Sequence, residues 1–187
     1  MAEGKSFVTT GPILELTVYG KKPGESISFN SNRTVHIKAR VRCDVTPVTD
    51  LQIIIGGNTL KHINVPKQHG QHAWIELETS VTLNQSTWIA ARATSTAPSG
   101  SPDAEAQTNP VTIYVNGKAP YVPASHQFLV EKLSEETQRQ ISRKDFPGKD
   151  KLVDYFKGSL QRLEGLKETQ GLSREEALNL IPESRQR

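Results

Sequence analysis

From about residue 6 to residue 115, the apolar residues alternate with polar ones or form short β-branched runs. Residues 35–41 show this clearly, because Val, Ile and Ala alternate there with His, Lys and Arg. Such alternation is typical of a strand with one buried and one solvated face. Gly, Pro and Asn separate the segments, and none of them has helical spacing. Parallel neighbours would need crossover helices, so the sequence predicts a mainly β chain: an antiparallel, immunoglobulin-like β-sandwich.

The pattern gives roughly eight strands and one clear hairpin. The hairpin joins residues 51–55 to residues 60–65 through Gly56-Gly57-Asn58, whose residue types adopt positive φ readily. The longest connection, residues 94–110, is rich in Ser, Pro, Ala and Gly, so we expect an exposed, mobile excursion there. The expected strands are residues 7–8, 13–18, 35–41, 51–55, 60–65, 75–81, 88–92 and 111–115.

The periodicity changes near Pro120, so we expect a β-sandwich domain over residues 1–119 and a helical C-terminal extension over residues 120–187. One helix is expected to begin near Pro123 and to carry Phe128, Leu129 and Leu133. Pro147-Gly148 breaks the chain, and Asp150 is the expected N-cap of a second helix. The apolar stripe expected on that helix consists of Leu152, Val153, Phe156, Leu160 and Leu163. A capping-box pattern at Ser173–Glu176 predicts a short last helix that ends at Pro182.

The charge distribution disfavours nucleic acid as a partner. The formal net charge is +3, but residues 1–122 hold 11 of the 23 Lys and Arg and 9 of the 20 Asp and Glu, so both parts are nearly balanced. A nucleic-acid-binding surface usually shows a basic stripe, and none is visible. No segment approaches the roughly 20 apolar residues that cross a bilayer, so we expect no membrane partner either.

No residue pattern indicates catalysis, so we assign no catalytic, cofactor-binding or metal-binding residue and expect no cofactor. His62, His69 and His72 lie close together in the sequence, but no Asp, Glu or Cys lies between residues 51 and 75 to complete a ligand set. Glu76 and Glu78 alternate with apolar residues and are therefore expected on one solvated strand face. Cys43 has no disulfide partner and is expected to be a small buried hydrophobe.

The aromatic residues permit a second interpretation. Tyr19, Trp74, Trp88, Tyr114 and Tyr121 are of the kind that line carbohydrate-binding faces of β-sandwiches. Because a sandwich of this length needs large core residues and has few others, we expect Trp88 to lie inside it. Asn32-Arg33-Thr34 and Asn84-Gln85-Ser86 match the glycosylation pattern, which is short enough to arise by chance.

Several segments, in order, are similar to a known family. The opening, Glu3–Pro12 (EGKSFVTTGP), resembles the G-[RK]-[ST]-[FY]-V-T-x-G-P segment that follows the catalytic domain in carbaryl-hydrolase-like (CehA-type) members of the PHP metallohydrolases, named for polymerase and histidinol phosphatase. The similarity continues through residues 14–20 and the Pro23-Gly24-Glu25 turn. Leu51–Gly57 resembles L-x-[IL]-[IV]-x-[ND]-G, with Gly56 at the position that is usually Asn or Asp.

Two further segments complete the resemblance. Trp88–Ala93 is similar to the end of S-x-W-I-A-A-R, and Thr108–Gly117 to [HT]-[TS]-x-P-[VI]-Y-[VF]-x-V-[ND]-G. In the family, the His and Asp metal ligands lie on a preceding catalytic domain. No residue of this chain matches those ligand motifs, so the resemblance transfers no catalytic residue.

The resemblance implies a non-catalytic accessory or interaction domain. The partner it implies is a PHP-type catalytic domain, and self-association through the C-terminal helices is the other expected contact. The alternative is an extracellular immunoglobulin-like module that binds carbohydrate or a protein partner. The chain itself is expected not to be an enzyme.

Overall fold

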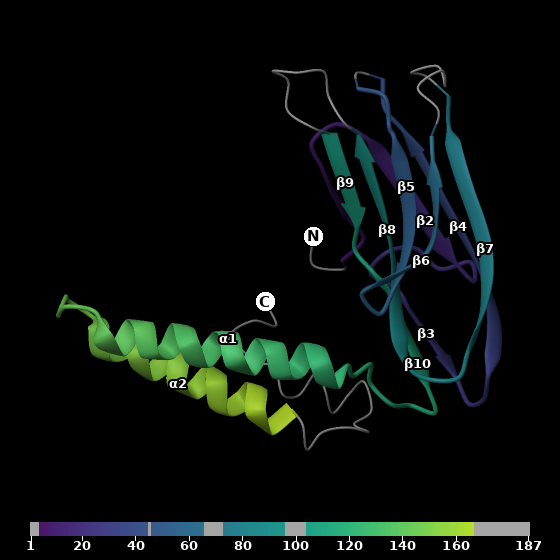
Figure 1. The fold of residues 1–187 in the computed structure, drawn as a ribbon. Coiled ribbons are helices and arrows are strands. Elements are labelled where there is room, and N and C mark those ends of the chain that lie inside the picture. Colours follow the sequence, from purple (N-terminus) through teal and green to yellow (C-terminus); the bar gives the residue numbers. More distant parts are fainter. Residues whose placement is uncertain (1–3, 45, 66–72, 96–103, 167–187) are drawn as a thin grey trace. The chain divides into compact units, whose positions relative to one another are not determined.

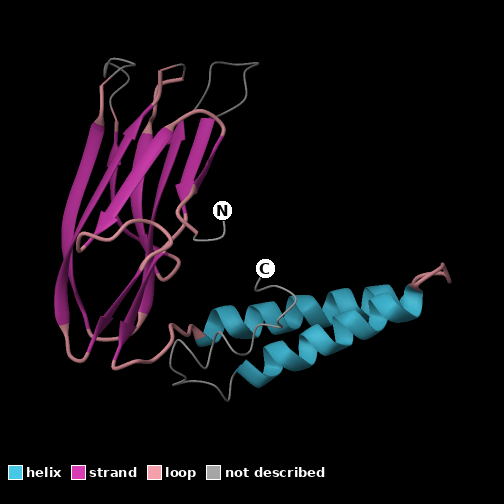
Figure 2. Ribbon diagram, turned by 180° about the vertical axis from the view of Figure 1, so that it is seen from behind, coloured by secondary structure: helices cyan, strands magenta, loops and turns pink. Residues whose placement is uncertain are grey.

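The computed structural model describes residues 4–44, 46–65, 73–95 and 104–166. The chain divides into two compact units, Met1–Pro120 and Tyr121–Arg187. The first unit is built from strands and the second from helices (Figures 1 and 2).

The first unit is a sandwich of two sheets, as the sequence predicted. One sheet has the strand order β1-β9-β8-β10-β3, with β5 pairing on β8 and β6 on β5; the other has the order β2-β4-β7. We call them the seven-stranded and three-stranded sheets. The arrangement is immunoglobulin-like. Strands β2, β4 and β7 correspond to strands A, B and E of the immunoglobulin fold, and the opposite sheet is built around the strands that correspond to C, F and G. The strands are β1 (Phe7–Thr9), β2 (Ile13–Val18), β3 (Ser26–Phe29), β4 (Arg33–Arg42), β5 (Asp50–Ile55), β6 (Asn58–Asn64), β7 (Ile75–Leu83), β8 (Thr87–Ser95), β9 (Ala104–Thr108) and β10 (Val111–Val115).

The core lies between the sheets and is almost entirely aliphatic. Alternation along β4 buries residues 35, 37, 39 and 41 between the sheets, and the residues between them lie on the outer face of the three-stranded sheet. Leu51 and Ile53 of β5, with Ile89 of β8, cover the opposite side of the same core. Phe29 is the one aromatic residue among the described core residues.

The predicted hairpin is confirmed. Strands β5 and β6 pair in antiparallel register from Asp50 opposite Asn64 to Ile55 opposite Asn58. Gly56 and Gly57 have φ values of 53° and 93°, the left-handed region that glycine enters without a Cβ clash. An irregularity in the register falls between Ile53 and Ile54.

One pair of strands contradicts the expectation that all pairing is antiparallel. Residues 26–29, which the pattern did not predict as a strand, form β3, and β3 pairs in parallel with β10. The connection between them needs no crossover helix. The chain leaves β3 for the opposite sheet at β4, and it reaches β10 only after passing between the two sheets again through β5 to β9. A two-layer sandwich therefore supplies the crossover that a single sheet would need a helix to make.

A second correction concerns residues 94–110. Strand β8 continues through Ser95, and residues 104–108 form β9, which pairs with both β8 and β1. Ala104, Ala106 and Thr108 face inward and are buried. Small residues carry little hydrophobic periodicity, which is why the composition favoured a loop. Residues 96–103 of this connection lie outside the described part.

The second unit is a helical hairpin. Helix α1 (Pro123–Ser142) begins with the predicted proline, and α2 (Lys149–Gly165) lies beside it (Figure 2). The predicted N-cap Asp150 is wrong: the N-cap is Gly148, with φ 86°, and Asp150 lies in the first turn. The glycine's left-handed conformation makes the sharp entry into α2, and no side-chain cap is formed.

The two helices present different apolar faces. The predicted stripe of α2, from Leu152 to Leu163, is half-buried. In α1, Leu133 is half-buried, but Phe128 and Leu129 are 57% and 51% exposed. The His126 ring nitrogen Nε2 lies 2.6 Å from the carbonyl oxygen of Leu163 and joins the two helices. The short helix predicted after Ser173 lies outside the described residues.

The inward position of β9 leads to a stability prediction. The hydroxyl oxygen of Thr108 accepts the buried backbone N–H of Ala91 at 3.0 Å. Thr108→Val keeps the shape but leaves that N–H without an acceptor, so the free energy of unfolding should fall by about 1–3 kcal/mol. Urea denaturation measures the change. Thr17→Val, at an exposed position of β2, is the matched control and should shift it by less than about 0.5 kcal/mol. Equal effects at the two threonines would contradict a buried β9.

Candidate interaction face

The outer surface of the seven-stranded sheet is the candidate functional site. The alternation of residues along β8 shows which of its side chains lie on that surface. Ile89, Ala91 and Ala93 are fully buried and belong to the core between the sheets. Trp88, Ala90 and Arg92 therefore point to the opposite, outer face.

The expectation that Trp88 lies inside the sandwich is wrong. It is half-buried and lies outside the core cluster. The space between the sheets is filled by aliphatic side chains such as Ile53, Ile89 and Ile113, each fully buried. That packing leaves no volume for an indole ring.

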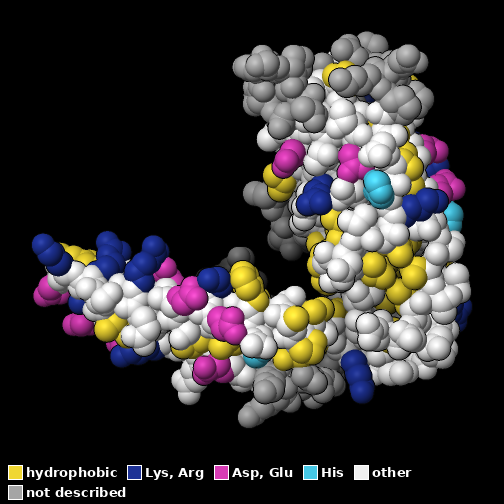
Figure 3. All heavy atoms as spheres, viewed as in Figure 1, with side chains coloured by type: hydrophobic (Ala, Val, Ile, Leu, Met, Phe, Trp, Pro, Cys, Tyr) yellow, Lys and Arg dark blue, Asp and Glu magenta, His cyan; other side chains and the backbone are white. Residues whose placement is uncertain are grey.

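Part of the outer face is apolar. Ile54 lies opposite Ala90, and the two are only 8% and 1% exposed, yet neither belongs to the core between the sheets. Trp88 lies opposite Thr112 on β10, and Tyr114 is the next residue of β10 on the same face. We call Ile54, Trp88, Ala90 and Tyr114 the aromatic patch. Hydrophobic side chains gather over this sheet in the space-filling view (Figure 3).

Beside this apolar part, a row of hydrogen-bonded polar side chains runs across β6, β5 and β8. Arg92 donates from Nε and Nη2 to Oε1 of Gln52 at 3.2 and 2.8 Å. The amide nitrogen of Gln52 donates to Oδ2 of Asp50, and Oδ1 of Asp50 lies 3.4 Å from Nδ1 of His62. We call His62, Asp50, Gln52 and Arg92 the polar row. Each member fixes its neighbour, so these polar groups are held in place beside the aromatic patch.

A shallow cavity of about 380 Å³ adjoins the polar row near β1 and β9. Arg92, Glu105 and Gln107 line it, together with Val8, whose side chain is 75% exposed. The outer face therefore combines an apolar centre, an ordered polar row and a shallow depression.

The outer face of the three-stranded sheet is different, because ion pairs cover it. Nζ of Lys38 lies 2.9 Å from Glu76 and 3.0 Å from Glu78, and Nε of Arg40 lies 2.7 Å from Glu15. Hydrogen bonding to Glu76 and then Glu78 raises the pKa of Lys38, and the bond from Lys38 is the main cause that lowers the pKa of Glu78. As predicted, both glutamates face outward, and they share a lysine rather than flank a cleft.

The five candidate aromatics do not form one binding face. Trp74 lies against Arg40, with the guanidinium carbon 4.4 Å from the ring centroid, on the three-stranded sheet. Tyr19 lies in the turn after β2 and makes an edge contact with Phe29. Tyr121 belongs to the helical unit, where it contacts His126. Trp88 and Tyr114 alone share a face.

The remaining candidate residues are the histidines, Cys43 and the two glycosylation patterns. His62 belongs to the polar row, whereas His69 and His72 lie outside the described residues. Across the described ranges, no group of three or more His, Cys, Asp or Glu side chains could hold a metal ion. Cys43 is buried in the core, as predicted. Asn32 and Asn84, which begin the two glycosylation patterns, are exposed in turns.

Sequence reasoning missed Ile54 and the polar row. The run Ile53-Ile54-Ile55 was the available indication, because an unbroken apolar run predicts a strand that is covered on both faces. The polar row was not visible, since Gln52 and Arg92 are forty residues apart and meet only through the β5–β8 register.

Comparison with known proteins gives structural neighbours of low similarity. The CARDB domain of a Pyrococcus furiosus protein, solved by NMR, is 15% identical over 56% of this chain and 97% of that chain, with a TM-score of 0.35. The crystal structure of that domain in complex with di-metal ions is 17% identical over 56% and 96% of the two chains, with a TM-score of 0.34. A lytic polysaccharide monooxygenase from Jonesia denitrificans is 15% identical over 49% of this chain and 58% of that chain, with a TM-score of 0.27.

No protein-family model and no curated protein matches this chain. The helices that the structure describes include none long and apolar enough to span a membrane.

The outward position of Trp88 predicts a modest stability effect. Trp88→Ala removes a half-buried side chain and opens no cavity between the sheets, so it should lower the free energy of unfolding by about 1–2 kcal/mol. Ile89→Ala, at the adjacent and fully buried position, should cost about 2–5 kcal/mol. Urea denaturation of both variants tests this, and a larger loss for Trp88→Ala than for Ile89→Ala would place the indole inside.

The ion pairs of the three-stranded sheet predict a pH effect. The lowered pKa of Glu78 means that its contribution to stability is present above the ordinary glutamate pKa and is lost as the pH falls through the folded-state pKa. In Lys38→Met, the pKa of Glu78 should rise toward its ordinary value. NMR titration of the Glu78 carboxyl carbon measures this, and an unchanged pKa in Lys38→Met would rule out Lys38 as the cause.

Proposed function

We propose that this chain is a non-catalytic accessory domain that binds a larger protein through the aromatic patch, and that its partner is a PHP-type metal-dependent hydrolase domain. The observation that carries the proposal is the contrast between the two outer faces of the sandwich. The three-stranded sheet is covered by ion pairs, whereas the seven-stranded sheet bears Ile54, Trp88, Ala90 and Tyr114.

The composition of the seven-stranded face suits protein recognition. Tryptophan and tyrosine contribute large contact areas and are over-represented in the residues that dominate binding energy. Arg92 and His62 of the polar row stand at the margin of this apolar centre, where polar groups fix the orientation of a partner.

Support for a PHP-type partner comes from the resembling segments. Leu51–Gly57 contains β5 residues Gln52 and Ile54, Trp88–Ala93 contains most of the outward residues of β8, and Thr108–Gly117 contains Tyr114. These three segments are far apart in the chain, yet β5, β8 and β10 are neighbours in the seven-stranded sheet. The segments that resemble the family thus provide the aromatic patch and half of the polar row.

The helical unit supports the second expected contact, self-association. Phe128 and Leu129 are more than half exposed on α1, and Tyr155 is 57% exposed on α2. Large exposed apolar groups are typical of surfaces that pack against a partner.

The proposed partner is tested directly by binding. The full chain is titrated, in a calorimeter, into a purified PHP-type catalytic domain that carries the family's His and Asp metal ligands and comes from the same genome. We expect a complex that Trp88→Ser weakens by about 30-fold, which corresponds to the loss of one dominant contact residue. Trp74→Ser is the matched control on the opposite face and should change the affinity less than about 2-fold.

A glycan array distinguishes the carbohydrate alternative, which the shared face of Trp88 and Tyr114 favours. Glycan binding that Trp88→Ser abolishes, with no binding to the catalytic domain, would replace the proposed function with sugar recognition. Equal losses for Trp74→Ser and Trp88→Ser would show that the seven-stranded face is not the contact surface.

A further inference from the structure

Strand β2 forms one edge of the three-stranded sheet and, among the described strands, pairs with β4 alone. In antiparallel pairing, successive residues direct their backbone groups alternately toward the partner and away from it. The N–H of Tyr19 donates to the carbonyl of His36 at 2.8 Å, which marks that pair as hydrogen-bonded. The residues two and four positions before Tyr19, Thr17 and Glu15, therefore also direct their backbone groups toward β4. The N–H and C=O groups of Leu14 and Leu16 therefore point to the open edge.

Local contacts close this edge at both ends. Oγ1 of Thr9 donates to the carbonyl of Pro12 at 2.6 Å. Val18 and Lys21 exchange two backbone hydrogen bonds, each of 2.9 Å. Between these closures, the described residues provide no hydrogen-bond partner for the outward peptide groups of Leu14 and Leu16. Two N–H donors and two C=O acceptors thus remain on the edge of β2, and their spacing matches the backbone groups of one short added strand.

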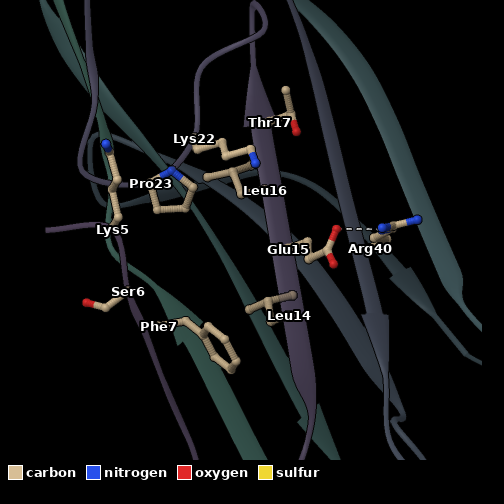
Figure 4. A pocket seen from close by; sticks show the side chains of 10 residues that line it. All are labelled: Lys5, Ser6, Phe7, Leu14, Glu15, Leu16, Thr17, Lys22, Pro23 and Arg40. Carbon is tan, nitrogen blue, oxygen red and sulfur yellow. Dashed lines mark hydrogen bonds and ion pairs between the residues drawn. The ribbon is translucent and has the colours of Figure 1, made fainter. Parts of the chain in front are cut away.

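A cavity of about 470 Å³ follows the same edge. Phe7 and Pro23 supply apolar surface beside the buried Leu14 and Leu16, so an incoming chain would find apolar contacts as well as backbone groups (Figure 4). The close-up shows Pro23 between Lys5 and Lys22 on one side of β2.

The charges around the cavity favour an acidic occupant. Arg40 of its lining is paired with Glu15 at 2.7 Å, whereas no carboxylate of the described residues lies within ion-pair distance of the Lys22 ammonium group. The adjacent Lys21 and Glu25 lie 3.7 Å apart and cancel each other. A second copy of β2 would bring a second Lys22 to the same edge, so charge disfavours pairing between two copies and favours a partner of opposite sign.

We propose that the open edge of β2 binds an extended, acidic segment of a partner protein by strand addition. The segment becomes a fourth strand of the three-stranded sheet and exchanges backbone hydrogen bonds with Leu14 and Leu16. Its alternate side chains contact Phe7 and Pro23, and its carboxylates lie near Lys22. This site is separate from the aromatic patch, which belongs to the other sheet.

Amide hydrogen exchange provides the test, with a synthetic peptide of alternating Glu and Val, acetylated and amidated at its ends, as the probe. Added to the full chain at millimolar concentration, it should slow exchange of the Leu14 and Leu16 amides by about 10-fold or more, the effect of one new hydrogen bond at each site. The amides of Glu15 and Thr17 already face β4 and should change little.

Matched variants and peptides identify the interactions. Lys22→Glu should weaken binding several-fold, whereas Lys118→Glu, in the turn beyond the far end of β10, should leave it unchanged. Replacing Glu by Lys in the peptide, or methylating its alternate backbone nitrogens, should reduce the affinity about 10-fold. The proposal is overturned if the acidic peptide does not bind, if it binds without protecting Leu14 and Leu16, or if the N-methylated peptide binds equally well.

Discussion

Close packing of two aliphatic sheet faces is the interaction on which the rest of this structure depends. Leu51, Ile53 and Ile89 from one sheet meet Val35 and Ile37 from the other, and all five are fully buried. β-branched side chains have few rotamers and fill the space between pleated sheets well. The alanines of β8 keep the layers close, so the core has little room for aromatic rings. Both tryptophans accordingly lie outside it.

Because both tryptophans lie outside the core, each lies on an outer face of the sandwich, and the two faces differ in what surrounds the indole ring. On the three-stranded sheet, the guanidinium group of Arg40 covers the ring of Trp74, and Lys38 pairs with Glu76 on the same solvated face. On the seven-stranded sheet, Trp88 lies beside Ile54 and Ala90, whose burial on an outer face has no parallel on the other sheet. The same packing rule thus gives one solvated face and one partly apolar face, which is the contact surface that we propose.

The chain's crossing from one sheet to the other near its N-terminus creates the second proposed contact site. Strand β1 pairs with β9, the chain turns at Gly11-Pro12, and β2 pairs with β4 in the opposite sheet. A Cβ at Gly11 would lie 3.3 Å from that of Ala104, so this close passage favours glycine. Because β1 and β2 belong to different sheets, they do not pair with each other, and the edge of β2 stays open. The open edge is thus a result of how the sandwich begins.

The sequence by itself determined the elements whose residues interact locally. Alternation fixed β4, the glycine pair fixed the β5–β6 hairpin, and helical spacing fixed the half-buried stripe of α2. Tertiary structure decided whatever depends on partners distant in the chain. Strands β3 and β9 are too short or too rich in small residues to be visible as patterns, and pairing with β10 and β8 is what makes them strands. Trp88 faces outward because aliphatic residues of other strands already fill the core. Arg92, Gln52 and Asp50 form a row only because the register of β5 and β8 places them side by side.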